Sequence, residues 1–252
     1  HLDLDADDEP DLPRPQGNPY RVFAPPLDLT LPASANRDAA VVQLFYWCNQ
    51  MHDWLYDLGF NEAAGNFQKE NFGRGGLGGD PIMADAQDGS GVNNANFTPT
   101  DDGESGRIQL FVFDGATPTR DGDLDAEIIL HEYTHGLSTR LVGGGLGLST
   151  LQSEGLGEGW SDFFALCLLS EPKDDPDAPY AMGAYVTRSF FGLEENYYFG
   201  IRRYPYSTEF AINPLRFRDI DGAQISNYPE VPRNPVFPFS SGLASEPHNQ
   251  GE

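Results

Sequence analysis

Apolar residues recur at helical spacing in three stretches of the chain, and the first of these is the longest. Between Asn36 and Leu58 the apolar positions follow one another at intervals of three and four residues, and Gly59 ends the run. This pattern predicts a long core helix. Alternating apolar positions occur only in short segments. They predict strands near Pro81–Ala86, around Ala95–Phe97 and, most clearly, at Ile108–Phe113.

Two further helices are expected in the middle of the chain. Residues 121–125 supply aspartates, which favour the N-terminus of a helix, so a helix is predicted from about 126 to 141. The glycines of 143–145 end it. After a Gly-rich loop, the next helix is predicted from Glu158 to about residue 170, because Pro172 cannot continue it.

The fold class expected from these elements is α+β with a small mixed sheet and many irregular connections. The chain has 252 residues, enough for a large core, and its 28 Gly and 20 Pro divide it into short elements. Residues 1–35 are rich in Asp and Pro and show no period, so we expect an extended arm over the body. Residues 36–252 are expected to form the folded body.

Charge and cysteine content restrict the classes of function. A formal net charge of −24 disfavours binding to nucleic acid or to an anionic membrane, although clustered carboxylates make calcium a second candidate cation. No run of 18 apolar residues occurs, and the acidic first residues do not resemble a signal peptide, so the protein is either cytosolic or has lost a leader. Two cysteines, Cys48 and Cys167, allow at most one disulfide bond.

The chemistry of the chain is concentrated in His131-Glu-Tyr-Thr-His135, which lies inside the predicted helix 126–141. Two histidines four residues apart share one helical face, so both imidazoles can bind a single zinc ion. Glu132 follows the first histidine and is placed to act as a general base on a water molecule. The apolar residues 128–130 indicate that this part of the helix is buried, where polar side chains need a partner.

A catalytic zinc ion requires a third protein ligand, and a carboxylate is expected. A histidine six residues after His135 is excluded because position 141 is Leu. Glu158 is the favoured ligand, with Asp162 one turn later on the same face to accept a hydrogen bond from a ligand histidine. Glu154 is the alternative ligand, and Glu158 would then serve only as an acidic first-turn residue.

Nine segments of the chain together form a recognisable set of motifs. They are Leu44-Phe-Tyr46, His52–Tyr56, Leu58–Phe67, Ala86–Gly91, Asn93–Phe97, Arg120–Asp123, His131–Leu141, Glu154–Phe164 and Arg203–Thr208. This set resembles the fungalysin family of secreted zinc endopeptidases, which are relatives of thermolysin. The resemblance covers about residues 40 to 252 and is far more specific than the histidine motif alone.

The resemblance implies a thermolysin-like zincin catalytic lobe and a role for each motif residue. It implies zinc bound by His131, His135 and Glu158, with Glu132 as the general base. Asn94 and Ala95 resemble an edge strand that binds the substrate backbone, and a turn is the alternative for this Asn- and Gly-rich segment. His248 resembles a late histidine that donates to the oxyanion, and the resemblance also implies secretion and a propeptide.

The chain departs from the family pattern because it stops at Glu252, before the family's C-terminal helical lobe. Residues 36–252 are therefore expected to form a zincin domain without that lobe, and the remainder is a candidate partner as a separate chain. The function expected is zinc-dependent hydrolysis of peptide bonds in protein or peptide substrates. A non-catalytic zinc-binding or assembly module is the alternative, and a zinc hydrolase acting on other substrates is a third hypothesis.

Overall fold

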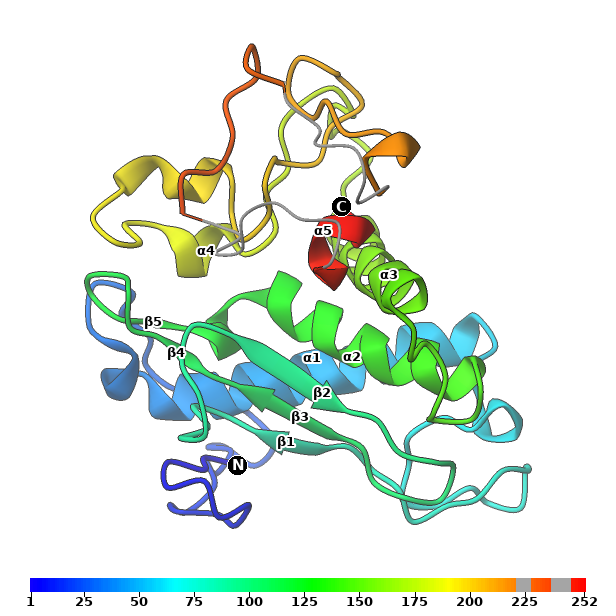
Figure 1. The fold of residues 1–252 in the computed structure, drawn as a ribbon. Helices are drawn as coiled ribbons and strands as arrows, with labels where there is room; N and C mark the ends of the chain where they lie inside the picture. Colours follow the sequence, from blue (N-terminus) through cyan, green and yellow to red (C-terminus); the bar gives the residue numbers. More distant parts are fainter. Residues whose placement is uncertain (221–227, 237–245) are drawn as a thin grey trace.

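A three-stranded sheet forms one side of the molecule, and helices pack against it (Figure 1). The structure is a computed structural model that describes residues 1–220, 228–236 and 246–252. The strands are β1 Met83–Asp85, β2 Ala95–Thr98 and β3 Arg107–Leu110, in the order β1-β3-β2. Because β1 runs parallel and β2 antiparallel to β3, the sheet is mixed, as predicted.

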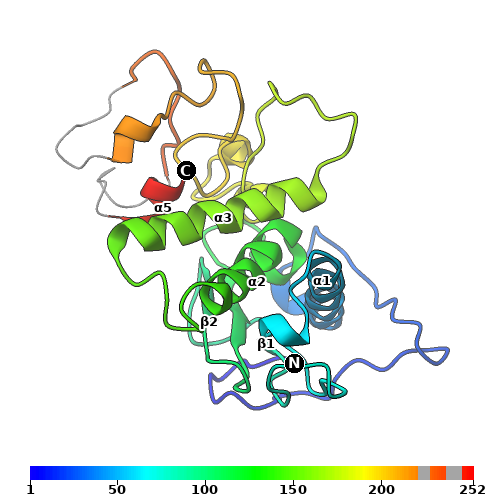
Figure 2. The same ribbon diagram turned by 90° about the vertical axis from the view of Figure 1, so that its right-hand side faces the viewer.

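Three long helices form the rest of the framework: α1 Arg37–Asp57, α2 Ala126–Leu141 and α3 Leu151–Leu169. Helix α2 lies between α1 and α3 and touches both (Figure 2). The described residues from about 170 onward are mostly irregular, lie on the far side of α3 and include the short helices α4 Ala184–Thr187 and α5 Pro247–Gly251. The 3-10 helices are Ala33–Ala35, Glu62–Ala64, Gly122–Leu124, Glu194–Tyr198 and Phe217–Ile220.

The predicted α+β class and the first two predicted helices are confirmed, but the prediction of one strand at Ile108–Phe113 is wrong. The chain forms β3 up to Leu110 and then β4 Val112–Phe113, which pairs with β5 Arg120–Asp121 in a separate two-stranded sheet. Leu110 and Phe111 are both buried, although successive side chains of one strand face opposite sides. The strand therefore breaks where the apolar alternation breaks.

The start predicted for the third helix is also wrong. Helix α3 begins at Leu151, where Thr150 and Ser153 form a capping box, so it includes the glycines predicted to be loop. These glycines are explained by packing. A Cβ at Gly155 would lie 2.6 Å from the Gln250 Cβ, and one at Gly159 would lie 2.6 Å from the Gly251 carbonyl oxygen. Because glycine has no side chain, α5 can pack closely against α3. This packing offsets the low helix propensity of glycine.

The amino-terminal arm is partly anchored to the sheet. Leu2 is buried and forms a parallel bridge with Ala86, at the end of β1. Apart from this bridge and the 3-10 helix Ala33–Ala35, residues 1–35 contain no helix or strand, and the domain boundary at residue 36 stays a prediction. Cys48 and Cys167 are both free. Among the described residues, no helix is long and apolar enough to cross a membrane.

The buried face of α1 contributes strongly to stability. Leu55 is almost completely buried in the cluster shared by α1, α2 and α3. We expect Leu55→Ala to lower the free energy of unfolding by about 2–5 kcal/mol, because it removes buried methyl groups and leaves a cavity. Leu58→Ala is the control, since Leu58 is exposed, and it should cost no more than about 0.5 kcal/mol. Urea unfolding followed by circular dichroism measures both, and equal losses would contradict this account of the core.

Candidate metal centre

Two neighbouring helices bring the three favoured ligands together. His131 and His135 lie on α2, and Glu158 lies on α3 beside it. The Nε2 atoms of the two histidines are 3.0 Å apart. The Glu158 Oε2 atom lies 3.1 Å from the Nε2 atom of His131 and 3.5 Å from that of His135. Each of the three side chains thus points one ligand atom at a common centre, although they lie up to 27 residues apart in the sequence.

These separations fit a zinc ion. Zinc–nitrogen bonds of about 2.0–2.1 Å in tetrahedral geometry place the ligand atoms about 3.3 Å from one another. In addition, the buried Glu158 Oε2 atom has no hydrogen-bond partner of good geometry among the described residues. A cation at the centre would satisfy this oxygen and the two facing nitrogens at once. His131, His135 and Glu158 are therefore the residues that would hold the metal.

Asp162 fixes the orientation of His131. Its Oδ1 atom lies 2.7 Å from His131 Nδ1, so the ring donates its Nδ1 proton to the carboxylate and leaves Nε2 free to bind a metal. Burial alone would lower the pKa of His131, but the neighbouring carboxylates of Asp162 and Glu158 raise it to about 10. The two carboxylates therefore favour positive charge at this position.

Asp162 is itself held by Arg202 and Tyr206. Arg202 donates from Nε and Nη2 to the two carboxylate oxygens at 2.6 and 2.7 Å, and the Tyr206 hydroxyl donates to Oδ2 at 2.6 Å. Burial tends to raise the pKa of Asp162, but the charge of Arg202 outweighs it and holds that pKa well below its usual range. The carboxylate that orients His131 is therefore always ionised near neutral pH.

Sequence analysis did not identify Arg202, and Tyr206 entered it only as part of the matching segment Arg203–Thr208. Arg203, in the same segment, donates from Nε to Glu252 at 2.8 Å. No regular spacing links residue 202 to the histidine motif. A buried carboxylate such as Asp162 does require a cation, and that requirement was the only signal available.

Glu132 is buried on α2 directly after the first ligand. Burial raises its pKa, and the charges of His131 and His135 act in the opposite direction. A carboxylate with a raised pKa is a stronger base, and a position next to a metal ligand keeps it near the metal. This environment suits the role of general base.

His248 reaches the same centre from α5. Its Nε2 atom lies 3.1 Å from Glu158 Oε2, and its Nδ1 atom lies 2.6 Å from Glu246 Oε1. The ring is roughly parallel to that of His131, with centroids 6.4 Å apart. His248 therefore lies beside the candidate ligand Glu158, and its catalytic role stays a prediction.

The remaining predicted site residues lie in less informative positions. Glu154, the alternative ligand, is exposed one turn before Glu158 and belongs to no metal-binding group among the described residues. Ala95 is buried on β2, an edge strand that touches α2, whereas Asn94 is exposed. Their role in binding a substrate stays a prediction.

Calcium binding likewise stays a prediction. Carboxylates converge in two groups that share Asp3, far along the chain from the histidine motif. One group adds Asp5 and Asp11, and the other adds Asp85 and Asp88. Asp85 already has a cationic partner in Arg107, so the second group is partly neutralised.

Removing one support of Asp162 should weaken metal binding without removing a ligand. We expect Tyr206→Phe to reduce zinc affinity about 10-fold, because such supporting hydrogen bonds typically contribute 10- to 100-fold. Tyr204→Phe is the control, since no hydrogen bond joins its hydroxyl to Asp162 in the described part of the chain. Competition with a chromogenic zinc chelator measures both affinities. An unchanged affinity in Tyr206→Phe would show that Arg202 alone holds the carboxylate.

Comparison with known sequences gives the same assignment over most of the chain. The model of the fungalysin metallopeptidase family (M36) matches residues 6–231. The chain belongs to the fungalysin metallopeptidase family. Membership implies a metal site, typically one for zinc, and the group of His131, His135 and Glu158 is the candidate within the described residues.

Fungal proteins of this family are close in sequence. The chain is 47% identical to extracellular metalloproteinase 4 of Arthroderma otae over 211 residues, which cover 82% of this chain and 31% of that protein. It is also 47% identical to extracellular metalloproteinase MEP of Neosartorya fischeri over 193 residues, covering 75% and 29%. The chain therefore spans only about a third of the length of these fungalysin relatives.

Proposed function

We propose that this chain carries the catalytic centre of a zinc-dependent endopeptidase with a thermolysin-like zincin arrangement. The observation that carries the proposal is the convergence of His131, His135 and Glu158 on one point, with Glu132 buried on the same helix as the two histidines. A purely structural zinc site has no use for a base in that position. This argues against the non-catalytic module as the function of the chain.

The chemistry assigns one role to each residue around the metal. When bound, zinc supplies Lewis acidity, which polarises a peptide carbonyl and acidifies a water molecule. Glu132 would accept a proton from the attacking water molecule and later pass it to the leaving amine. Asp162 keeps the Nδ1 proton of His131 in place, so that the ring keeps its orientation throughout.

His248 is assigned the stabilisation of the oxyanion. A hydrogen-bond donor aimed at developing negative charge lowers the barrier most when it is held in advance. Glu246 provides that restraint: it caps α5 by accepting from Asn249 N, and its other oxygen binds His248 Nδ1. The opposite nitrogen, Nε2, is therefore directed toward the metal centre.

The proposed substrates are extended protein or peptide segments. The β2 strand pairs only with β3 among the described residues, so its other edge is free to bind a substrate backbone at Asn94 and Ala95. The relatives are named extracellular metalloproteinases, which supports a secreted protein. The proposed partners are the protein's own propeptide and the remaining C-terminal portion as a separate chain.

The proposal is tested by metal-dependent cleavage of an unstructured protein. The chain loaded with one equivalent of zinc should cleave casein at internal bonds, identified by mass spectrometry of the products. A zinc chelator should abolish cleavage, and added zinc should restore it. Stoichiometric zinc binding without any new amino termini would reject peptidase activity and favour the non-catalytic module. Cleavage that continues at full rate in the chelator would reject the metal mechanism.

A further inference from the structure

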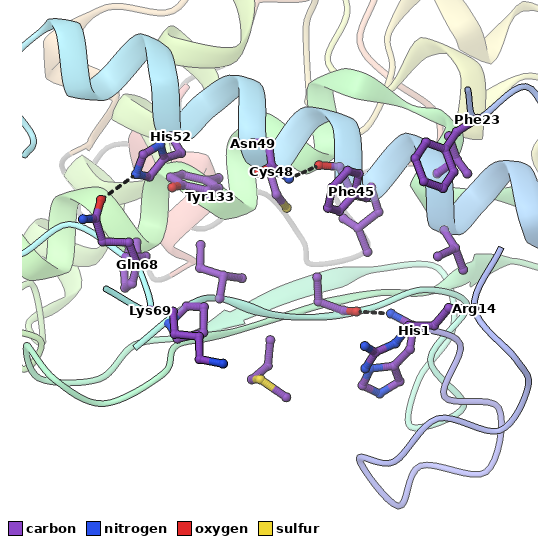
Figure 3. A pocket seen from close by; sticks show the side chains of 18 of the residues that line it. His1, Arg14, Phe23, Phe45, Cys48, Asn49, His52, Gln68, Lys69 and Tyr133 are labelled. Carbon is purple, nitrogen blue, oxygen red and sulfur yellow. Dashed lines mark hydrogen bonds between the residues drawn. The ribbon is translucent and has the colours of Figure 1, made fainter. Parts of the chain in front are cut away.

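A large groove separates α1 from β1, on the side of the sheet edge away from β3 (Figure 3). Its volume is about 890 Å³, and its lining is mainly apolar. Phe45 lines it from α1 although 61% of its side chain is exposed, and Phe23 packs near the same ring. Val41 and Val42 on α1 and Ile82, Met83 and Ala84 at β1 also line the groove.

The backbone of β1 offers hydrogen bonds along this groove. Met83 N donates to Gly106 O at 2.9 Å, and Gly106 directly precedes β3. The N–H of Met83 therefore points toward β3. In a parallel ladder, the next residue faces the opposite side. Ala84 therefore points its N–H away from β3, and in the described part of the chain no strand lies opposite that N–H.

The same edge is already used by the start of the arm. Ala86 N donates to His1 O at 2.6 Å, Asp3 N donates to Ala86 O at 3.3 Å, and His1 N donates to Ala84 O at 2.7 Å. Residues 1–3 thus run parallel to β1 and are joined to its end by a single bridge. Because the two run in the same direction, polypeptide leading into His1 comes from beside Ile82 and Ala84, along the groove.

We propose that the groove receives a β-strand of polypeptide continuous with the amino side of His1, which extends the sheet by pairing with the free edge of β1. The ladder fixes the register. The Ala84 N–H then donates to the carbonyl oxygen of the second residue before His1 in the chain. Side chains alternate along this strand, and Leu2 already points into the core between the sheet and α1. The first, third and fifth residues ahead of His1 therefore face α1 and are apolar.

Helix α1 gives independent support for a covering strand. Its buried face is formed by Ala40, Leu44, Met51 and Leu55, yet Phe45, on another side of the helix, is an exposed aromatic residue. A helix that is apolar on more than one side is typically covered on more than one side. The proposed strand would lie against the side that includes Phe45.

The register is tested with two extensions of identical composition placed directly ahead of His1. The hexapeptide Thr-Val-Thr-Val-Thr-Val puts its valines at the first, third and fifth positions, whereas Val-Thr-Val-Thr-Val-Thr turns every valine to the other face. The first extension should raise Tm by about 5 °C or more relative to the second. It should also slow hydrogen exchange of the Ala84 amide at least about 10-fold. Equal Tm values and equal exchange with the two extensions would overturn the proposal.

A pair of substitutions in the extended protein tests the groove itself. Phe45→Ala should remove at least half of the gain in Tm, because Phe45 lines the groove. Tyr46→Ala should leave the gain unchanged, since Tyr46 is the next residue on α1, is 52% exposed and does not line the groove. A free hexapeptide that gives the full gain, while the joined extension gives none, would place the occupant on a separate chain and reject this assignment.

Discussion

Replacement of Glu132 by glutamine should abolish hydrolysis while zinc remains bound. Glutamine has the shape of glutamate but cannot accept a proton from water at neutral pH, and general-base catalysis typically contributes about 10²–10⁴-fold to the rate. We therefore expect kcat for a peptide substrate to fall by at least about 10³-fold. Zinc content, measured by atomic absorption, should stay at the wild-type value because Glu132 is not among the three converging ligands.

Glu127→Gln is the matched control on the same helix. Burial, followed by the charge of Asp125, raises the pKa of Glu127 to about 8, so this side chain is largely neutral at pH 7. Its oxygen accepts a hydrogen bond from Gly183 N at 2.7 Å, which a glutamine oxygen can also accept. The control should lose less than about threefold in activity. Retained peptidase activity in Glu132→Gln would reject Glu132 as the base.

The histidine motif and its helix could be predicted from the sequence because local periodicity and local chemistry agree there. The interval of four residues between His131 and His135 is a helical interval, and the bounds of α2 match the predicted 126–141. Information of this kind resides in one continuous segment. No knowledge of the remaining chain is needed to read it.

The predictions failed where the outcome depends on contacts between distant segments. The glycines of α3 read as a loop, because α5, which packs against Gly155 and Gly159, lies almost one hundred residues later. Arg202 carries no local signal of its pairing with Asp162, 40 positions away. In both places tertiary packing overrides local propensity, which is weak for any single residue.

Replacement of Glu158 by glutamine should remove zinc from the site, and Glu154→Gln should not. Binding of zinc by four ligands is worth about 10–16 kcal/mol in small peptides, so one ligand contributes on average about 3 kcal/mol. This corresponds to a loss of about 100-fold or more in affinity for Glu158→Gln, with a matching loss of activity at low zinc. Glu154 lies one turn earlier on the same helix and is exposed, which makes it a control of the same chemistry in the same element.

The two substitutions also separate the role of ligand from that of a helix-terminal charge. Glu154 lies in the first turn of α3, whereas Glu158 is well inside the helix, so only Glu154 is near the positive end of the helix dipole. Glu154→Gln should therefore cost a few tenths of a kcal/mol of stability without changing zinc affinity. Glu158→Gln should change affinity far more than the stability of the metal-free protein. If zinc affinity falls in Glu154→Gln and not in Glu158→Gln, the third ligand is Glu154, and α3 must rotate or unwind at its start when the metal binds.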